Sequence, residues 1–157
     1  MKRTVLLSVI AATLLFLTAC GSSAAQPAPT AAALGAVAGT QVDASGGTEV
    51  DITLADNTIQ SSLTTFKVGV PYRFVIINNG NHLHNFNINP PVDAAGSLDA
   101  ALSSALLSVP QDKLPIGGGT TVTYAFPASA AGQKLELSCL IRRHYEDGMR
   151  LAITVTN

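Results

Sequence analysis

Apolar and polar residues alternate along much of the chain after Thr48, and this alternation predicts β-strands. Val50, Ile52 and Leu54 are separated by polar residues, and a period of two indicates a half-buried strand, which a turn at residues 55–57 ends. The segment 63–68 is interpreted as a second strand, which the turn residues 69–71 close. Residues 72–77 form a near-continuous apolar run, which is typical of a strand buried on both faces, and a turn at 78–80 ends it.

Later segments continue the pattern. Residues 121–126 alternate again, and His84, Phe86 and Ile88 share one phase, so His84 faces the core if the two apolar residues do. In each of two further segments, alternate apolar residues share a phase that is expected to face inward. They are Leu135, Leu137 and Cys139 in the first segment, and Met149, Leu151, Ile153 and Val155 in the second. We therefore expect the sulfur atoms of Cys139 and Met149 to face the same interior end of a sandwich.

Residues 89–119 interrupt the strand pattern. Pro90 and Pro91 break the preceding strand, and apolar residues then recur at helical spacing between Leu98 and Val109, with Ser97 as a candidate N-cap. The spacing predicts one short helix packed on the sandwich, whose apolar stripe belongs to the core rather than to a docking surface. No internal repeat occurs.

Together these patterns predict an all-β protein. About seven short strands with turn signals between them, and one short helical insertion, are typical of a Greek-key β-sandwich. The sandwich is expected to span residues 48–157 as one domain, because about 110 residues are enough to form a hydrophobic core.

The N-terminal segment has a different character. Lys2 and Arg3 precede an apolar run from Val5 to Leu17, which predicts a secretory signal peptide over residues 1–19. The run ends in Leu17-Thr18-Ala19-Cys20, which resembles the lipobox of bacterial lipoproteins and implies that Cys20 is acylated. An ordinary signal peptide cut beside an incidental cysteine is the alternative. Residues 20–47 are rich in small and polar residues, so we expect a flexible linker that tethers the domain to the outer side of a membrane.

Charge and cysteine content narrow the function. Removal of residues 1–19 takes away two of the nine basic residues and none of the ten acidic ones, so the mature chain has a formal charge of 7 − 10 = −3. This balance argues against nucleic acid as a partner. If Cys20 carries lipid, Cys139 is the remaining thiol in an exported and oxidising compartment, and metal ligation would explain an unpaired cysteine there.

Three chemically distinctive side chains lie within eleven residues near the C-terminus: Cys139, His144 and Met149. Taken singly, each has an ordinary structural explanation as a buried or packing residue. A thioether beside a thiolate and an imidazole, however, points away from zinc and towards copper that cycles between Cu(I) and Cu(II). A second histidine must come from elsewhere, and both His82 and His84 are candidates.

At these residues the sequence resembles the cupredoxins, or type 1 blue copper proteins. Their signature of an early His-Asn pair and a late Cys, His and Met corresponds here to His84-Asn85, Cys139, His144 and Met149, with a loop spacing most like that of rusticyanin and the auracyanins. The resemblance implies one type 1 copper ion held by His84, Cys139, His144 and Met149. It also implies that Asn85 links the two metal-bearing loops and that electrons pass through His144.

The resemblance implies a one-electron carrier rather than an enzyme. Multicopper oxidases have two further histidines beside the cysteine, and Ser138 and Leu140 stand at those positions here, which favours a mononuclear site. A copper storage or delivery lipoprotein and a cupredoxin domain that has lost its metal are the alternatives. The chain departs from the family at Arg142-Arg143 and Arg150-Leu151, which leaves the loop shape open.

The expected partners are a redox donor and acceptor, among which membrane respiratory or photosynthetic complexes are candidates, and the protein itself is expected to be a monomer. Arg142, Arg143 and Arg150 gather around the loop of an acidic chain and are candidate docking residues for an acidic partner. Alternatively, they pair with Glu146 and Asp147 or remain solvated.

Overall fold

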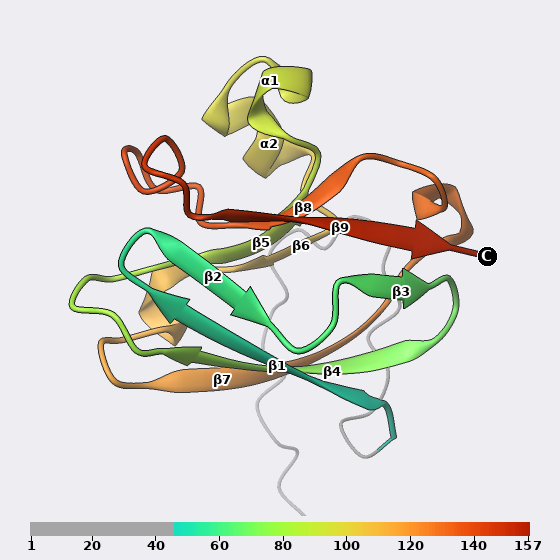
Figure 1. The fold of residues 1–157 in the computed structure, drawn as a ribbon, viewed down its shortest axis with the longest axis horizontal. Helices are drawn as coiled ribbons and strands as arrows, with labels where there is room; N and C mark the ends of the chain where they lie inside the picture. Colours follow the sequence, from blue (N-terminus) through green and yellow to red (C-terminus); the bar gives the residue numbers. More distant parts are fainter. Residues whose placement is uncertain (1–45) are drawn as a thin grey trace, which may run out of the picture. The chain divides into compact units, whose positions relative to one another are not determined.

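The computed structural model describes residues 46–157, which form two β-sheets packed face to face (Figure 1). One sheet has the strand order β2-β1-β4-β7, with bounds Thr58–Ser61, Thr48–Ala55, Pro71–Asn78 and Gly119–Ala125. The other has the order β3-β9-β8-β5-β6, with bounds Thr65–Lys67, Arg150–Thr156, Leu135–Ser138, Phe86–Asn89 and Leu107–Val109. The signal peptide predicted at 1–19, Cys20 and nearly all of the linker predicted at 20–47 lie outside the described residues. No helix within 46–157 is long and apolar enough to cross a membrane.

Most strand pairs are antiparallel, but β1 runs parallel to β4, and β3 runs parallel to β9. The prediction of an all-β sandwich is confirmed, although the described residues contain nine strands rather than about seven. One added strand is β2, which follows the predicted turn at residues 55–57 and pairs with β1. Asn57 has a φ of 64°, a left-handed conformation that asparagine tolerates better than most residues, so it suits this tight turn.

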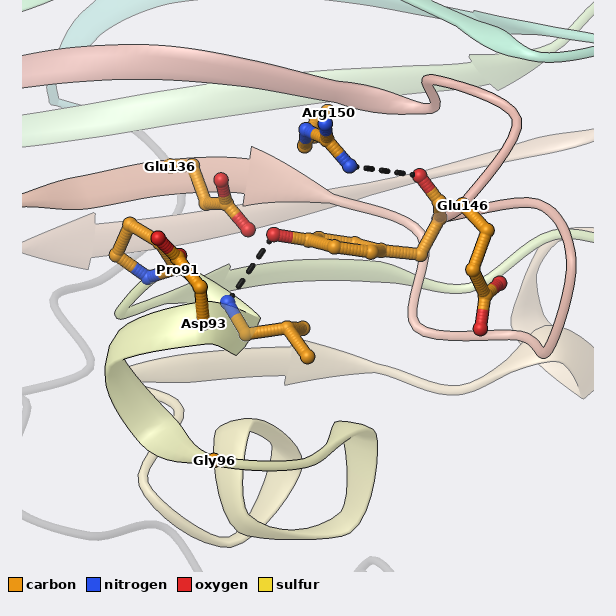
Figure 2. A pocket seen from close by; sticks show the side chains of 8 residues that line it. Pro91, Asp93, Gly96, Glu136, Glu146 and Arg150 are labelled. Carbon is orange, nitrogen blue, oxygen red and sulfur yellow. Dashed lines mark hydrogen bonds between the residues drawn. The ribbon is translucent and has the colours of Figure 1, made fainter.

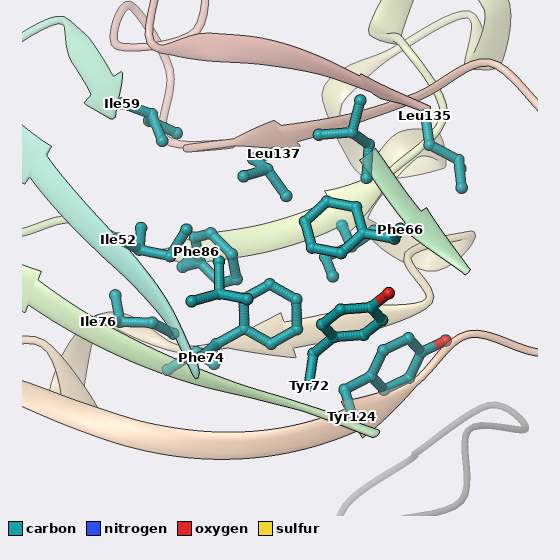
Figure 3. Close-up of a cluster of buried hydrophobic side chains, with 14 of the residues drawn as sticks. Ile52, Ile59, Phe66, Tyr72, Phe74, Ile76, Phe86, Tyr124, Leu135 and Leu137 are labelled. Atoms are coloured by element: carbon teal, nitrogen blue, oxygen red, sulfur yellow. The ribbon is translucent and has the colours of Figure 1, made fainter. Parts of the chain in front are cut away.

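The interior of the sandwich follows the predicted phases. Val50, Ile52 and Leu54 are buried, as are the predicted inward residues of β8 and β9 apart from Leu151, which is partly buried. Phe66, Phe74 and Phe86 lie at the centre (Figure 3). The rings of Phe66 and Phe74 have centroids 5.8 Å apart, which is within the range at which aromatic pairs attract each other. These contacts fix the two sheets against each other and hold the ends of the strands at the candidate site.

Strand β4 differs from its prediction. It was expected to be buried on both faces, but Tyr72, Phe74 and Ile76 are buried while Ile77 on the other face is 49% exposed. The reason is that β4 lies between β1 and β7 in a sheet whose outer face is not covered by another layer of described residues. Its apolar run therefore reflects strand propensity rather than burial on two sides.

The helical insertion is also more complex than predicted. It forms two short helices, α1 (Val92–Ala95) and α2 (Leu98–Ser103), and residues 107–109 form β6 instead of continuing the helix. Ser97 caps α2 as predicted, because its side chain accepts a hydrogen bond from the Ala100 amide at 3.1 Å. The helix ends at Ser103, and the following residues pair with β5, whose edge would otherwise be unpaired. Two 3₁₀ turns, Gln111–Lys113 and Ala128–Ala130, complete the connections.

The insertion covers the outer face of the second sheet, so β5 and β8 are buried on both faces. That outer face is polar. Ser138 donates from Oγ to Asn89 Oδ1 at 2.6 Å, and Asn87 Nδ2 donates to the Ser138 carbonyl at 3.3 Å. Buried polar groups need such partners, so the side chains on this face hold one register between β5 and β8. The fold thus fixes the two strands that lead into the candidate metal loops.

Candidate metal centre

Three ligand-type side chains converge at one end of the sandwich. The Nδ1 atoms of His84 and His144 lie 3.1 Å apart, and Cys139 Sγ lies 3.9 Å from the former and 3.6 Å from the latter. With bonds of about 2.0 Å to imidazole and about 2.3 Å to thiolate, the lengths found in zinc sites, one ion spans two imidazole nitrogens up to about 4.0 Å apart and an imidazole nitrogen and a thiolate up to about 4.3 Å apart. All three separations are shorter than this limit, so one metal ion can contact the three donors together.

The loop between β8 and β9 positions two of these residues. Cys139 follows the end of β8 and Met149 precedes β9, and the Cys139 amide donates to the Met149 carbonyl at 3.0 Å. The Met149 amide donates in turn to the His144 carbonyl at 2.9 Å. Met149 is fully buried in the core cluster that includes Cys139. The loop therefore brings Cys139, His144 and Met149, the three residues predicted from its sequence, to one place.

His84 comes from the loop that precedes β5 and is fully buried. Beside it, Asn85 Oδ1 accepts hydrogen bonds from the Leu140 amide at 2.8 Å and from Asn87 Nδ2 at 3.0 Å. Asn85 thus ties the His84 loop to the residue after Cys139. This is the link between the two loops that the sequence resemblance implied for Asn85.

His82 does not join the cluster. Its side chain is 66% exposed, and its Nδ1 lies 3.0 Å from Oδ1 of Asp56 in the turn between β1 and β2. The sequence resemblance favoured His84 as the second histidine, with His82 as the alternative. The structure places His84 in the group of candidate ligands and His82 against a carboxylate.

No family model and no curated protein matches the sequence. Solved structures do match the fold. Auracyanin B superposes with a TM-score of 0.57 at 22% identity, covering 74% of this chain and 94% of the other. Dithionite-reduced auracyanin from the photosynthetic bacterium Roseiflexus castenholzii gives 0.55 at 20% identity, covering 71% of this chain and 100% of the other.

The chain has a cupredoxin fold. This confirms the fold that the sequence resemblance implied. The candidate cluster of His84, Cys139 and His144, with Met149 buried nearby, fits the donors of a type 1 copper site.

Burial shapes the protonation of two candidate ligands in this cupredoxin fold. Burial raises the pKa of the Cys139 thiol, although amide contacts around residues 141 and 85 partly oppose it. Burial, followed by the nearby His144, lowers the pKa of His84. The imidazole is therefore kept neutral and ready to bind a metal, whereas the thiol needs a cation beside it to release its proton. The protonation behaviour of His84 and Cys139 is therefore compatible with a metal ion bound between them.

Two surface depressions flank the loop between β8 and β9. One, of about 310 Å³, is lined by residues that include His144, Arg142 and Arg143, together with Asp56, Asn57, His82, His84 and Asp147. His144 is half-buried, so its ring is the part of the cluster nearest to solvent. This depression therefore opens to solvent beside the half-buried side of the candidate centre.

The other depression, of about 590 Å³, lies on the opposite flank, between the loop and α1 (Figure 2). Arg150 lines it, with its guanidinium 4.8 Å from the centre of the Tyr145 ring and Nη1 donating to the Tyr145 carbonyl at 3.1 Å. Tyr145 Oη accepts a hydrogen bond from the Val92 amide at 3.1 Å. Of the three arginines predicted for docking, Arg142 and Arg143 thus share the depression with His144, whereas Arg150 is engaged with Tyr145.

Sequence reasoning did not identify Asp56 or Tyr145 as contributors to the site. Asp56 appeared as part of a turn, and nothing in its own segment indicates a contact with residues 81–84. Asp56 is an ionised carboxylate, because hydrogen bonds from His82 and Asn81 hold its pKa well below its usual range. Tyr145 lies next to His144 in sequence, but its contact with α1 arises from packing between distant segments.

Proposed function

We propose that this protein carries single electrons by means of one type 1 copper ion held by His84, Cys139, His144 and Met149. The observation that carries this proposal is the convergence of two imidazole Nδ1 atoms and one thiol sulfur in a cupredoxin fold. Such a donor set supports copper in both its Cu(I) and Cu(II) states, which supplies the one-electron chemistry.

The protein's own residues explain why exchange would be rapid. His84, Cys139 and Met149 are fully buried and come from strand ends that the core fixes, so their positions need not change between the two oxidation states. Burial keeps water from the donors, while the half-buried His144 connects the interior with the depression at the surface. The proposed donors come from the protein alone, so the proposal assigns no substrate and no enzymatic reaction.

Colour tests the proposal directly. Purified protein loaded with Cu(II) should bind one copper per chain, absorb strongly in the visible region and bleach with a reductant. Cys139→Ser should abolish the absorption, because the band arises from charge transfer between thiolate and copper. A coloured Cys139→Ser variant would contradict the ligand assignment. Met149→Gln should keep copper but lower its reduction potential, since an oxygen donor favours Cu(II).

Retention of copper separates a carrier from a store or delivery protein. A carrier with buried ligands should keep its copper through repeated cycles of oxidation and reduction beside a competing chelator. A delivery protein should surrender it within the same period. Copper content after gel filtration measures the outcome.

We also propose that the protein is exported and anchored to the extracytoplasmic side of a membrane through acylated Cys20. The support is the order of features in residues 1–20, where two basic residues are followed by an apolar run and then by a lipobox. Stable anchoring takes more than one lipid chain, because a single chain binds only marginally. Labelled fatty acid should enter the wild type but not Cys20→Ala, and recovery of soluble, unacylated wild type would refute the anchor.

The proposed docking surface is the depression beside His144, with Arg142 and Arg143 at its edge and a redox protein with an acidic patch as the partner. Its support is the exposure of both arginines in the described structure. Charges at this position would steer the encounter more than they would strengthen the final complex.

A further inference from the structure

The ring of His84 has a second nitrogen that the candidate ligand set does not use. Nδ1 faces Cys139 and His144, so Nε2 lies on the far side of the ring. Nε2 is buried and makes no hydrogen bond within the described residues. A histidine that binds metal through one nitrogen almost always donates the N–H of the other to a carboxylate, a carbonyl or water. The polar group that lies within reach of Nε2 is the Asp56 carboxylate, whose Oδ1 is 3.5 Å away.

Asp56 is held in position by the same loop that carries His84. The Asn81 amide donates to Oδ1 at 3.0 Å, and Asn81 Nδ2 donates to Oδ2 at 3.0 Å. His82 Nδ1 lies 3.0 Å from Oδ1. These three contacts join the β1–β2 turn to residues 81–82 and aim the carboxylate at the edge of the His84 ring. They also give a structural purpose to His82, which is not a member of the ligand cluster.

Gly80 closes the space around this contact. A Cβ at position 80 would lie 2.8 Å from His84 Nε2 and 2.6 Å from Asp56 Oδ1, which is closer than real Cβ atoms approach other heavy atoms. The Gly80 amide donates to Asn78 Oδ1 at 3.0 Å, so its backbone is fixed. A side chain at this position would therefore displace either the imidazole or the carboxylate. The absence of one lets the two groups meet.

We propose that Asp56 is a positioning residue that acts on the metal through His84. Its carboxylate accepts the Nε2 proton of metal-bound His84, fixes the plane of the ring and places a negative charge beside the site. This inference rests on the proposed function for the identity of the metal. A negative charge stabilises Cu(II) relative to Cu(I), because the oxidised ion has one more positive charge. Asp56 should therefore lower the reduction potential of the site.

Two substitutions separate the charge of Asp56 from its hydrogen bond. Asp56→Asn removes the charge but retains an oxygen acceptor, whereas Asp56→Ala removes both. Both variants of the full chain should bind copper in the same ratio as the wild type, and both should have a raised reduction potential. Asp147→Asn is the matched control, since it removes a carboxylate from the same depression without a described contact to His84. Its potential should move less than that of Asp56→Asn.

Nuclear magnetic resonance of the zinc-loaded protein gives a readout that does not depend on electron transfer. The Nε2 proton of His84 should exchange slowly with solvent in the wild type and in Asp56→Asn, and faster in Asp56→Ala. Gly80→Ala should also speed its exchange, because the added methyl group forces the two groups apart.

The outcomes distinguish this inference from the proposed function. If the copper-loaded wild type is colourless, the electron-carrier proposal fails, while proton exchange in the zinc form still decides the role of Asp56. Equal exchange in the wild type and Asp56→Ala would overturn the inference. So would a potential in Asp56→Asn that moves no more than in the Asp147→Asn control. Failure of zinc to bind through His84 would overturn it as well.

Discussion

The two histidines of the candidate centre are held in different ways. His84 is fully buried between a strand end, Asn85 and the Asp56 carboxylate, all of which come from the sandwich itself. His144 is half-buried on a loop in which Arg143 adopts a left-handed φ of 74°, and that loop is fastened by its neighbour Tyr145. One histidine is thus part of the core, whereas the other belongs to a surface loop. Under the proposed function, His84 would be the ligand fixed by the core, and His144 would be the ligand beside the proposed docking surface.

Removal of either imidazole should have the largest effect and should show the difference between the two histidines most clearly. His144→Gly should lose the visible absorption and regain it when free imidazole is added, because the half-buried ring leaves an opening to solvent. His84→Gly should lose the absorption without rescue and should also destabilise the fold, since a large side chain is removed from a closed interior. Truncation of a large apolar side chain in a core costs about 2 to 5 kcal/mol, which gives an upper scale for this loss.

Absorption spectra with and without imidazole, together with denaturant unfolding, measure both effects. Rescue of His84→Gly as complete as that of His144→Gly would show that the two ligands do not differ in access.

The anchor of the His144 loop can be tested by a pair of tyrosine variants. Tyr145→Phe removes the acceptor for the Val92 amide and should lower the free energy of unfolding by about 1 kcal/mol. Tyr124→Phe is the matched control, because Tyr124 Oη is buried and has no hydrogen-bond partner among the described residues. Its removal should be neutral or stabilising. Equal losses in the two variants would mean that the bond to Val92 does not fasten the loop.

The buried side of the same loop can be tested through Glu136, whose protonation should make the stability of the protein depend on pH. Burial raises the pKa of this carboxyl, although Tyr145, Arg150 and Asn89 partly oppose the effect. The folded protein therefore holds the proton to higher pH than the unfolded chain, and the stability from this group is lost as pH rises through the folded pKa. Glu136→Gln should thus gain stability relative to the wild type as pH rises from about 4.3, the ordinary value for glutamate, towards neutrality.

Unfolding midpoints of both proteins over that pH range measure the difference, in which the contributions of other groups cancel. A constant difference between Glu136→Gln and the wild type would show that burial in the folded protein does not raise the pKa of Glu136.

Substitutions of the charged residues on the exposed side of His144 should have the smallest effect. The double variant Arg142→Gln and Arg143→Gln should slow electron transfer to an acidic partner by a few-fold and weaken its salt dependence, because exposed charges are screened over about 8 Å at physiological ionic strength. Arg150→Gln is the control, since Arg150 packs on Tyr145 in the other depression. Stopped-flow rates at several salt concentrations measure the slopes. A double variant with the wild-type slope would place docking elsewhere.

The sequence by itself determined the features that depend on neighbouring residues. Alternation set the inward phase of β1, β8 and β9, and the close spacing of Cys139, His144 and Met149 indicated one loop and one kind of metal. The His-Asn pair at 84–85 completed the resemblance to a cupredoxin. These signals are local, because side-chain direction in a strand repeats every two residues whatever the strand pairs with.

Only the tertiary structure decided which residues meet across long separations. It placed His84 rather than His82 in the cluster, set Asp56 against His84 and separated Arg150 from Arg142 and Arg143. It also assigned residues 107–109 to a strand, because the edge of β5 offered unpaired backbone groups that helical periodicity in the sequence did not reveal. Asp56 and His84 are 28 positions apart, and the register of two sheets brings them together. Strand periodicity predicts to which face of a sheet a side chain points, but the residue that it contacts there depends on how the sheets pack.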